Sequence, residues 1–368
     1  MSKKIKAVIA IGGTGGHVIP GYNLALHLKE NNFIVDLVTD TRGLKYLKST
    51  KNLKIYTFPS SPLIKKNIFA SLFSFLVILY SILRSLVFLL FNRPTIIIGM
   101  GGYASFPICI AAAILKIKLI TYENNLFIGK ANKYLLPFSD KILVSYKELE
   151  GVPNRFNKKI YEIGNILKKE IILFSKKTNH IEKIKKLNLL VLGGSQAAKY
   201  FAESLPSIFR DCSNDGIPLK IYHHCLPHQN DELSLFYKNS KIEFEIFNFN
   251  HNLEEYFSKV NLAITRSGSS VLAELTNSNI PFISVPLPSS ADNHQLKNAI
   301  YYERKNFGFL IEEKDLNLRL SHFIKDIYRD NSKLNKIILN QRQYSDKNVY
   351  QNVDKAVSYT HLRAHETV

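Results

Sequence analysis

The hydrophobic and polar positions of this 368-residue chain repeat one arrangement four times. Each time, a short run of β-branched and aliphatic residues ends in a glycine-containing turn, and the pattern that follows is helical. This order of strand, glycine turn and helix is typical of βαβ units around buried parallel sheets. The four segments are KAVIAIGGTGGH from Lys6, TIIIGMGGYASFP from Thr95, NLLVLGGSQAAKYF from Asn188 and NLAITRSGSSVLAEL from Asn261.

Two of these units lie before residue 140 and two lie after residue 188, which predicts an α/β protein with two similar, doubly wound domains. Because the βα turns of a parallel sheet gather at its carboxyl edge, where ligands bind, two facing edges would enclose a cleft. We expect the domains over 1–163 and 164–357, with the option that the last helix packs back on the first domain. Residues 358–368 show no periodicity and are interpreted as a non-native tail.

Residues 68–91 form an apolar segment that is long enough to span a bilayer and contains one charge, Arg84. A membrane span here would split the sheet of the first predicted domain, since the segment lies between the first two glycine turns. We therefore predict one or two helices with one face on the core and the other against lipid. Lys65, Lys66 and Arg93 add to Arg84 and favour attachment to an anionic membrane surface. A fully buried helix pair is the alternative.

Lysine and arginine outnumber aspartate and glutamate, and the formal net charge is +19. Such a charge predicts attraction to anions, which include phosphorylated substrates, anionic lipids and nucleic acid; a lysine-rich composition with no particular partner is the alternative. The sequence contains no recognition helix, zinc finger or RNP-like motif, so we expect no nucleic-acid partner. Cys109, Cys212 and Cys225 are scattered, which indicates neither a disulfide framework nor a zinc site and fits a reducing compartment.

Each glycine turn is a candidate anion site, because backbone N–H groups and the positive end of a helix dipole point out of such a turn. The first turn is not a dinucleotide fingerprint, since Val18 stands where the last glycine would be, and no P-loop lysine follows it. Beside the fourth turn lie Arg266 and Glu274, and the Glu274 carboxylate could accept two hydrogen bonds from a ribose diol. Ser195 and nearby helix N–H groups could hold a diphosphate. The alternative for Glu274 is an exposed helix position without a binding role.

Seven motifs occur in the order and spacing of one family: GGTGGHVIP, GMGGYASFP, YENN, IGN, GGSQ, TRSGSSVLAE and DNHQLKNA. On these motifs, over about residues 4–355, the chain resembles the MurG family. That family transfers N-acetylglucosamine (GlcNAc) from UDP-GlcNAc to the 4-hydroxyl of undecaprenyl-diphospho-muramoyl-pentapeptide (lipid I). The resemblance implies the GT-B fold, in which two Rossmann-like domains face each other across a cleft. It also implies an inverting reaction without a metal or other cofactor, at the cytoplasmic face of the bacterial inner membrane.

The resemblance implies that the second domain binds UDP-GlcNAc. Glu274 matches the residue that binds the ribose of uridine, Ser195 matches a diphosphate contact, and Asn250 matches a backbone contact to uracil. Asn125 and Gln295 match residues near the donor sugar. Further residues expected on the donor side are Lys168, Arg266, Ser269 and Ser270.

Some positions depart from the family pattern. Tyr122 stands where the family often has histidine, so this position need not be titratable. Ile166 replaces the usual proline. Lys168 replaces the usual arginine, and a lysine keeps the positive charge but cannot form the bidentate hydrogen bonds of a guanidinium. His224 replaces a glutamine. These departures concern details of donor contact and leave the class of enzyme unchanged.

The implied reaction needs a base near the attacking hydroxyl and stabilised charge on the departing diphosphate. His17, in the first glycine turn, is the leading candidate for this base because the pKa of an imidazole is near neutrality, and Glu123 is the second candidate. Two other roles stay open for His17: orienting the acceptor or its diphosphate, and capping the first helix. The residues expected to face the acceptor or its phosphates, with tight strand–helix packing as the alternative, are Thr14, Gly15, Gly16, Gly101, Gly102 and Tyr103.

Two other functions stay open at this point. A glycosyltransferase that acts on another lipid, such as diacylglycerol, fits GGTGGH and GGSQ, although the end of DNHQLKNA favours the MurG family. The other is a catalytically silent, membrane-associated nucleotide-sugar binder, and the presence of His17, Glu274 and Gln295 argues against it.

Overall fold

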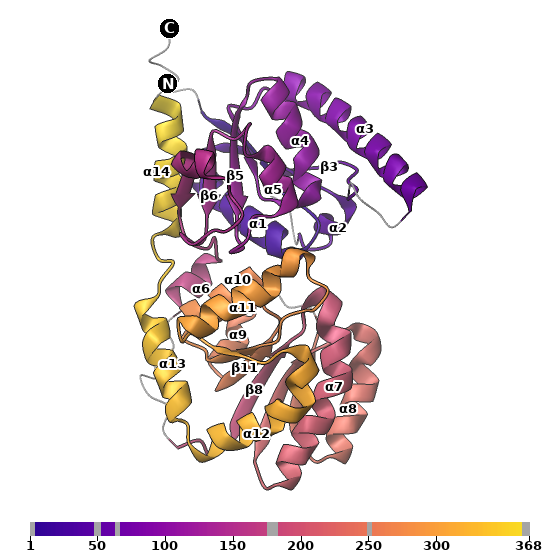
Figure 1. Cartoon of the computed structure of the whole chain (residues 1–368), viewed down its shortest axis with the longest axis vertical. Coiled ribbons are helices and arrows are strands. Elements are labelled where there is room, and N and C mark those ends of the chain that lie inside the picture. The colour runs from indigo at the N-terminus through magenta and orange to yellow at the C-terminus, as the bar shows by residue number, and fades with distance from the viewer. Residues whose placement is uncertain (1–3, 48–52, 63–66, 175–182, 249–251, 363–368) are drawn as a thin grey trace. The chain divides into compact units, whose positions relative to one another are not determined.

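The chain forms two compact units in the computed structural model (Figure 1). Unit 1 consists of Met1–Lys168 and Asn348–Val368, and unit 2 consists of Lys169–Lys347. The structure describes residues 4–47, 53–62, 67–174, 183–248 and 252–362, and of 195–198 and 358–362 it describes the backbone only.

Unit 1 is built around a seven-stranded parallel sheet with the strand order β3-β2-β1-β4-β5-β6-β7. Most of its strands are short apolar runs, as expected where helices cover both faces of a parallel sheet. The strands are β1 (Lys6–Ala10), β2 (Ile34–Thr39), β3 (Lys54–Thr57), β4 (Ile96–Gly99), β5 (Lys118–Glu123), β6 (Lys141–Val144) and β7 (Ile160–Glu162). The helices are α1 (Gly15–Glu30), α2 (Thr41–Leu44), α3 (Ile68–Asn92), α4 (Gly102–Ile114), α5 (Lys130–Leu135), a 3-10 helix (Asn154–Lys159) and α14 (Val349–Leu362).

Unit 2 is built around a six-stranded parallel sheet with the order β10-β9-β8-β11-β12-β13. The strands are β8 (Leu187–Leu192), β9 (Leu219–His224), β10 (Glu243–Phe247), β11 (Leu262–Thr265), β12 (Phe282–Ser284) and β13 (Phe309–Leu310). The α-helices are α6 (Lys169–Leu173), α7 (Gly194–Asn214), α8 (Asn230–Asn239), α9 (Glu254–Phe257), α10 (Ser269–Asn277), α11 (His294–Arg304), α12 (Leu316–Arg329) and α13 (Ser332–Gln343). Short 3-10 helices lie at Pro227–Gln229, Ala291–Asn293 and Glu313–Asp315.

In both sheets the first strand of the unit lies in the interior, and the strand order reverses beside it. β1 pairs in parallel with β4, and β8 pairs in parallel with β11. The glycine turns that follow these paired strands therefore lie side by side at the carboxyl edge, where doubly wound sheets bind ligands. The prediction of two doubly wound α/β domains is confirmed.

The boundary between the units lies a few residues beyond the expected one at residue 163. The segment up to Lys168 stays with unit 1 because its backbone is hydrogen-bonded there. The Ile166 N–H donates to the Tyr122 hydroxyl at 3.2 Å. The neighbouring Leu167 carbonyl accepts from a tyrosine hydroxyl of α14 at 2.5 Å.

The C-terminal helix α14 belongs to unit 1, although it follows unit 2 in the sequence. Oδ1 of its Asp354 lies 2.8 Å from Nε2 of His27 on α1. The ring of Tyr350 lies 4.4 Å, centroid to centroid, from the same imidazole. Residues 358–362, which the sequence placed in a non-native tail, continue α14, and 363–368 lie outside the described residues.

The apolar segment after β3 forms one helix, α3, and not two. The helix begins where the Asn67 side chain accepts a hydrogen bond from the Phe69 N–H at 2.9 Å. It ends at Arg93, whose φ of 44° is left-handed. By length and composition α3 could cross a membrane, and only 22% of its most apolar stretch is buried. The alternative of a fully buried helix pair is therefore wrong.

The buried side of α3 consists largely of serines. Ser74, Ser81 and Ser85 are buried, and α3 lies alongside α4 (Figure 1). The Ser74 hydroxyl is 2.9 Å from that of Ser61 in the loop before the helix. A soluble helix normally buries its apolar side, so α3 has the opposite orientation. The large exposed side chains, here called the apolar face of α3, are Ile68, Phe69, Leu72, Phe73, Phe75, Leu76, Leu79, Tyr80, Leu83, Val87, Leu90 and Phe91.

Candidate active site

The first glycine turn joins β1 to α1 and lies against α4. Gly12 and Gly13 both have positive φ angles, which favour glycine. A Cβ on Gly12 would lie 2.5 Å from the Cβ of Ala104, so the turn can touch α4 only because this side chain is absent. α1 begins at Gly15, and the side chain of its N-cap, Thr14, makes no capping hydrogen bond. The His17 N–H donates to the Thr14 carbonyl at 3.1 Å, so it is the N–H groups of Gly15 and Gly16 that can serve another acceptor.

His17 lies in the first turn of α1, beside the second glycine turn. A Cβ on Gly101 would lie 3.3 Å from Cε1 and Nδ1 of the imidazole, and a Cβ on Gly102 would lie 3.1 Å from Cδ2. The Gly16 carbonyl accepts a hydrogen bond from the Asn124 amide at 2.9 Å, which ties the loop after β5 to the same helical turn. The structure thus brings the half-buried imidazole and both predicted glycine turns together at one edge of the sheet.

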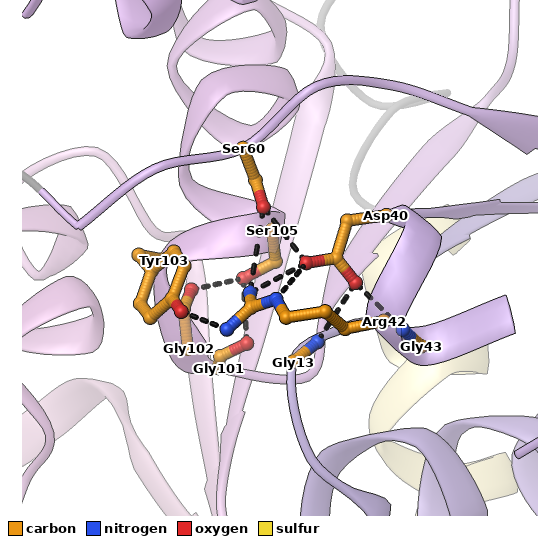
Figure 2. A network of polar contacts seen from close by, with 9 residues as sticks. All are labelled: Gly13, Asp40, Arg42, Gly43, Ser60, Gly101, Gly102, Tyr103 and Ser105. Atoms are coloured by element: carbon orange, nitrogen blue, oxygen red, sulfur yellow. Dashed lines mark hydrogen bonds and ion pairs between the residues drawn. The ribbon is translucent and has the colours of Figure 1, made fainter. Parts of the chain in front are cut away.

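A buried carboxylate that no sequence motif indicated, Asp40, connects three loops at this edge (Figure 2). Its Oδ1 accepts from the N–H groups of Gly13 at 3.0 Å and Gly43 at 2.8 Å. Its Oδ2 accepts from the Ser60 hydroxyl at 2.8 Å and from Arg42 Nε at 2.9 Å. Burial would raise the pKa of the Asp40 carboxyl, but these hydrogen bonds outweigh burial and hold that pKa below its ordinary value. The only sequence signal was a polar residue directly after an apolar strand.

Tyr103, a predicted acceptor-side residue, is held by the same group of side chains. NH1 of Arg42 donates to the Tyr103 hydroxyl, and the guanidinium lies 4.5 Å from the centroid of the ring. The Ser105 hydroxyl, two residues further along α4, donates to the Gly101 carbonyl at 2.9 Å (Figure 2). The second glycine turn is therefore fixed both by its own helix and by a residue that follows β2.

Glu123, the second candidate for the base, ends β5 and organises the loop that follows. Its Oε1 accepts from the backbone N–H of Asn125 at 3.1 Å and from the amide of the same residue at 3.0 Å. Its Oε2 accepts from the Gly129 N–H and from the Asn132 amide, both at 2.9 Å. A carboxylate that accepts four hydrogen bonds, from the loop after β5 and from Asn132 on α5, is poorly placed to take a substrate proton, so His17 is the stronger candidate of the two.

In unit 2, the first turns of α7 and α10 lie at the carboxyl edge, after the paired strands β8 and β11. Both N-cap residues, Gly193 and Gly268, are glycines and have no side chain that could cap these helices. Ser269 and Ser270 open α10, and Glu274 lies further along the same helix, where it is half-buried rather than fully exposed. Neighbouring helix N-termini of this kind suit a diphosphate.

Arg266 follows β11, but its side chain is buried in unit 2, with 5% of the residue exposed. Its NH1 lies 2.6 Å from Oε2 of Glu313 and donates to the carbonyls of Val285 and Pro286, both at 3.3 Å. The guanidinium also packs over the ring of Phe201, 4.7 Å from its centroid. These contacts place Arg266 as a support for the loop after β12, which differs from the open anion contact that the sequence suggested.

The remaining predicted residues are placed as follows. Gln295 lies on α11, and its Oε1 accepts from the Leu287 N–H at 3.0 Å. Lys168 is half-buried at the end of the first part of unit 1. The backbone of Ser195 belongs to the first turn of α7, and Asn250 lies outside the described residues. In the part of the chain that the structure describes, no three His, Cys, Asp or Glu side chains are grouped so that they could hold a metal ion.

The sequence matches two family models. The glycosyltransferase family 28 N-terminal domain matches residues 7–144, and the glycosyltransferase family 28 C-terminal domain matches residues 188–353. The UDP-N-acetylglucosamine–N-acetylmuramyl-(pentapeptide) pyrophosphoryl-undecaprenol N-acetylglucosamine transferase of Pelagibacter ubique is 36% identical over 318 residues, which are 86% of each chain. The enzyme of the same name from Rickettsia felis is 31% identical over 320 residues, 85% of this chain and 87% of that one.

Two solved structures have the same fold. MurG from Acinetobacter baumannii superposes with a TM-score of 0.75 at 21% identity, and the match covers 96% of this chain and 99% of that one. A putative UDP-N-acetylglucosamine 2-epimerase from Listeria monocytogenes superposes with a TM-score of 0.67 at 16% identity, over 100% of this chain and 98% of that one. These likenesses establish the GT-B fold, which hosts more than one reaction and does not by itself identify the activity.

Proposed function

Because the chain belongs to glycosyltransferase family 28, we propose that it transfers GlcNAc from UDP-GlcNAc to the 4-hydroxyl of the muramoyl-pentapeptide on undecaprenyl diphosphate. The observation that carries this proposal is the similarity, over 86% of the chain, to a Pelagibacter ubique transferase named for that acceptor. The paired glycine turns in each unit support it, since each pair presents helix N-termini where an anionic substrate can bind.

Unit 1 supplies the acceptor side of the reaction. The acceptor oxygen forms a bond to the anomeric carbon while the bond from that carbon to the UDP oxygen breaks, with inversion. His17 takes the hydroxyl proton, and its place between the two glycine turns supports this role because the N–H groups there hold the acceptor phosphates. Thr14, Gly15 and Gly16 contribute the first of these turns. Asn125, held by Glu123, contacts the donor sugar from the neighbouring loop.

Unit 2 supplies the donor side of the reaction. Negative charge develops on the diphosphate as UDP leaves, and the N-termini of α7 and α10 stabilise that charge. Glu274 accepts hydrogen bonds from the ribose hydroxyls, and Ser195 contacts the diphosphate. Gln295 has its Oε1 bonded to the Leu287 N–H, so its amide N–H groups serve the sugar hydroxyls. Asn250 contacts uracil through its backbone, and Lys168, the last residue of the first part of unit 1, adds a positive charge to the donor side.

We also propose that unit 1 attaches peripherally to the cytoplasmic face of the inner membrane through the apolar face of α3. Twelve large apolar or aromatic side chains are exposed along this one helix, far more than scattered surface positions would give. The buried serines opposite them resemble the small-residue side by which membrane helices pack together. The net charge of +19 favours an anionic leaflet, and the lipid-linked acceptor would be reached there.

Transfer of labelled GlcNAc from UDP-GlcNAc to a lipid I analogue, compared with transfer to diacylglycerol, tests the proposed function. We expect product with the lipid I analogue alone. Transfer to diacylglycerol alone would instead identify a glycosyltransferase of another lipid. Binding of UDP-GlcNAc without transfer to either acceptor would identify the silent nucleotide-sugar binder.

A further inference from the structure

Asp40 holds three loops of unit 1 with a single carboxylate. The loops follow β1, β2 and β3, which are neighbours in the sheet, and each contributes one donor from Gly13, Gly43 or Ser60. Gly43 is also packed tightly, since a Cβ there would lie 3.0 Å from the Cα of Gly12. The position of the first glycine turn is therefore fixed from the β2 side by a buried, ionised group.

Arg42 extends these contacts to the first turn of α4, the helix that follows β4 (Figure 2). Its guanidinium bonds Asp40 on one edge, the Tyr103 hydroxyl on another, and stacks on the Tyr103 ring. The side chain of Asp40 is 4% exposed, whereas that of Arg42 is 43% exposed. Arg42 thus covers the carboxylate and presents its own charge to solvent at the edge where both glycine turns lie.

Arg42 keeps donor capacity after these contacts are made. A guanidinium has five N–H groups. Nε and NH2 donate to Asp40, NH2 also lies 3.5 Å from the Ser60 hydroxyl, and NH1 donates to Tyr103. Among the described residues, this leaves one N–H of NH1 without a protein acceptor. NH2 would also lie 3.7 Å from a Cβ on Gly13, so the guanidinium rests directly against the first glycine turn.

We propose that Arg42 recognises a phosphate of the acceptor, and that Asp40 and Tyr103 hold its guanidinium in the orientation this contact needs. The proposal rests on the proposed function, because it takes a lipid-linked diphosphate as the acceptor. Arginine suits this task since its planar fork binds phosphate oxygens directionally and carries a permanent charge. A guanidinium already immobilised by two partners loses little further freedom when the phosphate binds. The competing role for Arg42 is to neutralise Asp40 and nothing more.

The test uses the full chain with Arg42→Lys, which keeps the charge but cannot bridge Asp40 and Tyr103. Steady-state transfer is measured with a short-chain lipid I analogue in detergent, varying acceptor and UDP-GlcNAc separately. We expect the acceptor KM to rise about tenfold, as for loss of a charge-assisted hydrogen bond, while the donor KM stays unchanged. Arg155→Lys is the matched control, because Arg155 also stacks on an aromatic ring of unit 1, Phe156, and should change neither KM.

A second acceptor separates phosphate recognition from support of the fold. In this analogue an uncharged linker of equal length replaces the diphosphate, and the effect of Arg42→Lys on KM should disappear. The proposal would be overturned if Arg42→Lys raised the acceptor KM equally for both analogues, or raised the donor KM as much as the acceptor KM. Arg42 would then serve only as the charge partner of Asp40. If Arg42→Lys does not fold, Tyr103→Phe carries the same comparison with an effect of about threefold. Absence of transfer by the wild type would overturn the proposed function, which is a separate outcome.

Discussion

The apolar face of α3 allows the membrane proposal to be tested quantitatively. The perturbation is a quadruple variant, Phe69→Gln, Leu72→Gln, Phe73→Gln and Leu76→Gln, on one side of the helix at i, i+3, i+4 and i+7. These four residues are 77%, 60%, 64% and 54% exposed, so their replacement should leave the fold intact.

The expected loss follows from the apolar surface that the membrane would cover. Complete burial of a leucine or phenylalanine side chain contributes about 1.5–3 kcal/mol, and somewhat more than half of each side chain is available here. Each substitution should therefore cost about 1 kcal/mol or more of membrane binding, and the four together roughly 4–6 kcal/mol. At 1.4 kcal/mol for each factor of ten, the partition coefficient should fall by about a thousandfold or more.

Co-sedimentation with anionic phospholipid vesicles, over a range of lipid concentrations, measures this loss. The matched control is Leu235→Gln with Leu318→Gln, because these leucines are 60% and 75% exposed on helices of unit 2. The control should bind vesicles like the wild type, and thermal unfolding should show that both proteins are folded. Equal vesicle binding by the quadruple variant and the wild type would refute the assignment of α3 as the membrane contact.

Four other substitutions test the site and its supports. His17→Ala should lower kcat by about a hundredfold or more, while UDP binding, measured by calorimetry, stays unchanged. A kcat near that of the wild type would exclude His17 as the general base. Glu274→Ala should raise the KM for UDP-GlcNAc and leave the acceptor KM alone, and an unchanged donor KM would contradict the ribose contact. Glu313→Gln leaves the buried Arg266 without its charge partner, and a loss of about 3 kcal/mol is expected in urea unfolding; a loss below about 0.5 kcal/mol would contradict the ion pair. Because hydrogen bonds lower the pKa of Asp40, its stabilising contribution is complete above the unfolded value of about 3.9 and is lost as the pH falls through the lower folded value. The Tm difference between the wild type and Asp40→Asn should therefore shrink below about pH 4, and a difference independent of pH would exclude an ionised Asp40.

The features that could be predicted from the sequence are those that depend on neighbouring positions. Each of the four strand–turn–helix segments forms as expected, because an apolar run, a glycine turn and a helical pattern are local signals. The pairing of the glycine turns also followed, since parallel strands place their turns at one edge. The existence of a long helix at α3 could be read from its hydrophobicity, but its orientation could not. Its buried side consists of serines, which would normally indicate the solvent-facing side of a helix.

The features that the sequence could not supply depend on distant partners. Arg266 looked like an anion ligand beside the fourth turn, but its charge is balanced by Glu313, which follows β13. Glu123 was the second candidate for the base, but the loop after it and Asn132 of α5 donate four hydrogen bonds to its carboxylate. Asp40 and Arg42 carry no motif, and they matter only because β2 lies next to β1 in the sheet. Single positions in such a network give no periodic signal.

The discontinuity of unit 1 sets an order of events during synthesis. α14 is translated after the whole of unit 2, yet its Val353 and Val357 are buried in unit 1, most of which is translated before unit 2. At about 5–20 residues per second, the intervening unit takes on the order of ten seconds or longer to be translated. Throughout that interval His27 of α1 lacks the contacts with Asp354 and Tyr350 of α14, and the apolar face of α3 is already exposed. A nascent chain in this condition would gain from reaching the lipid surface, or a chaperone, before translation ends.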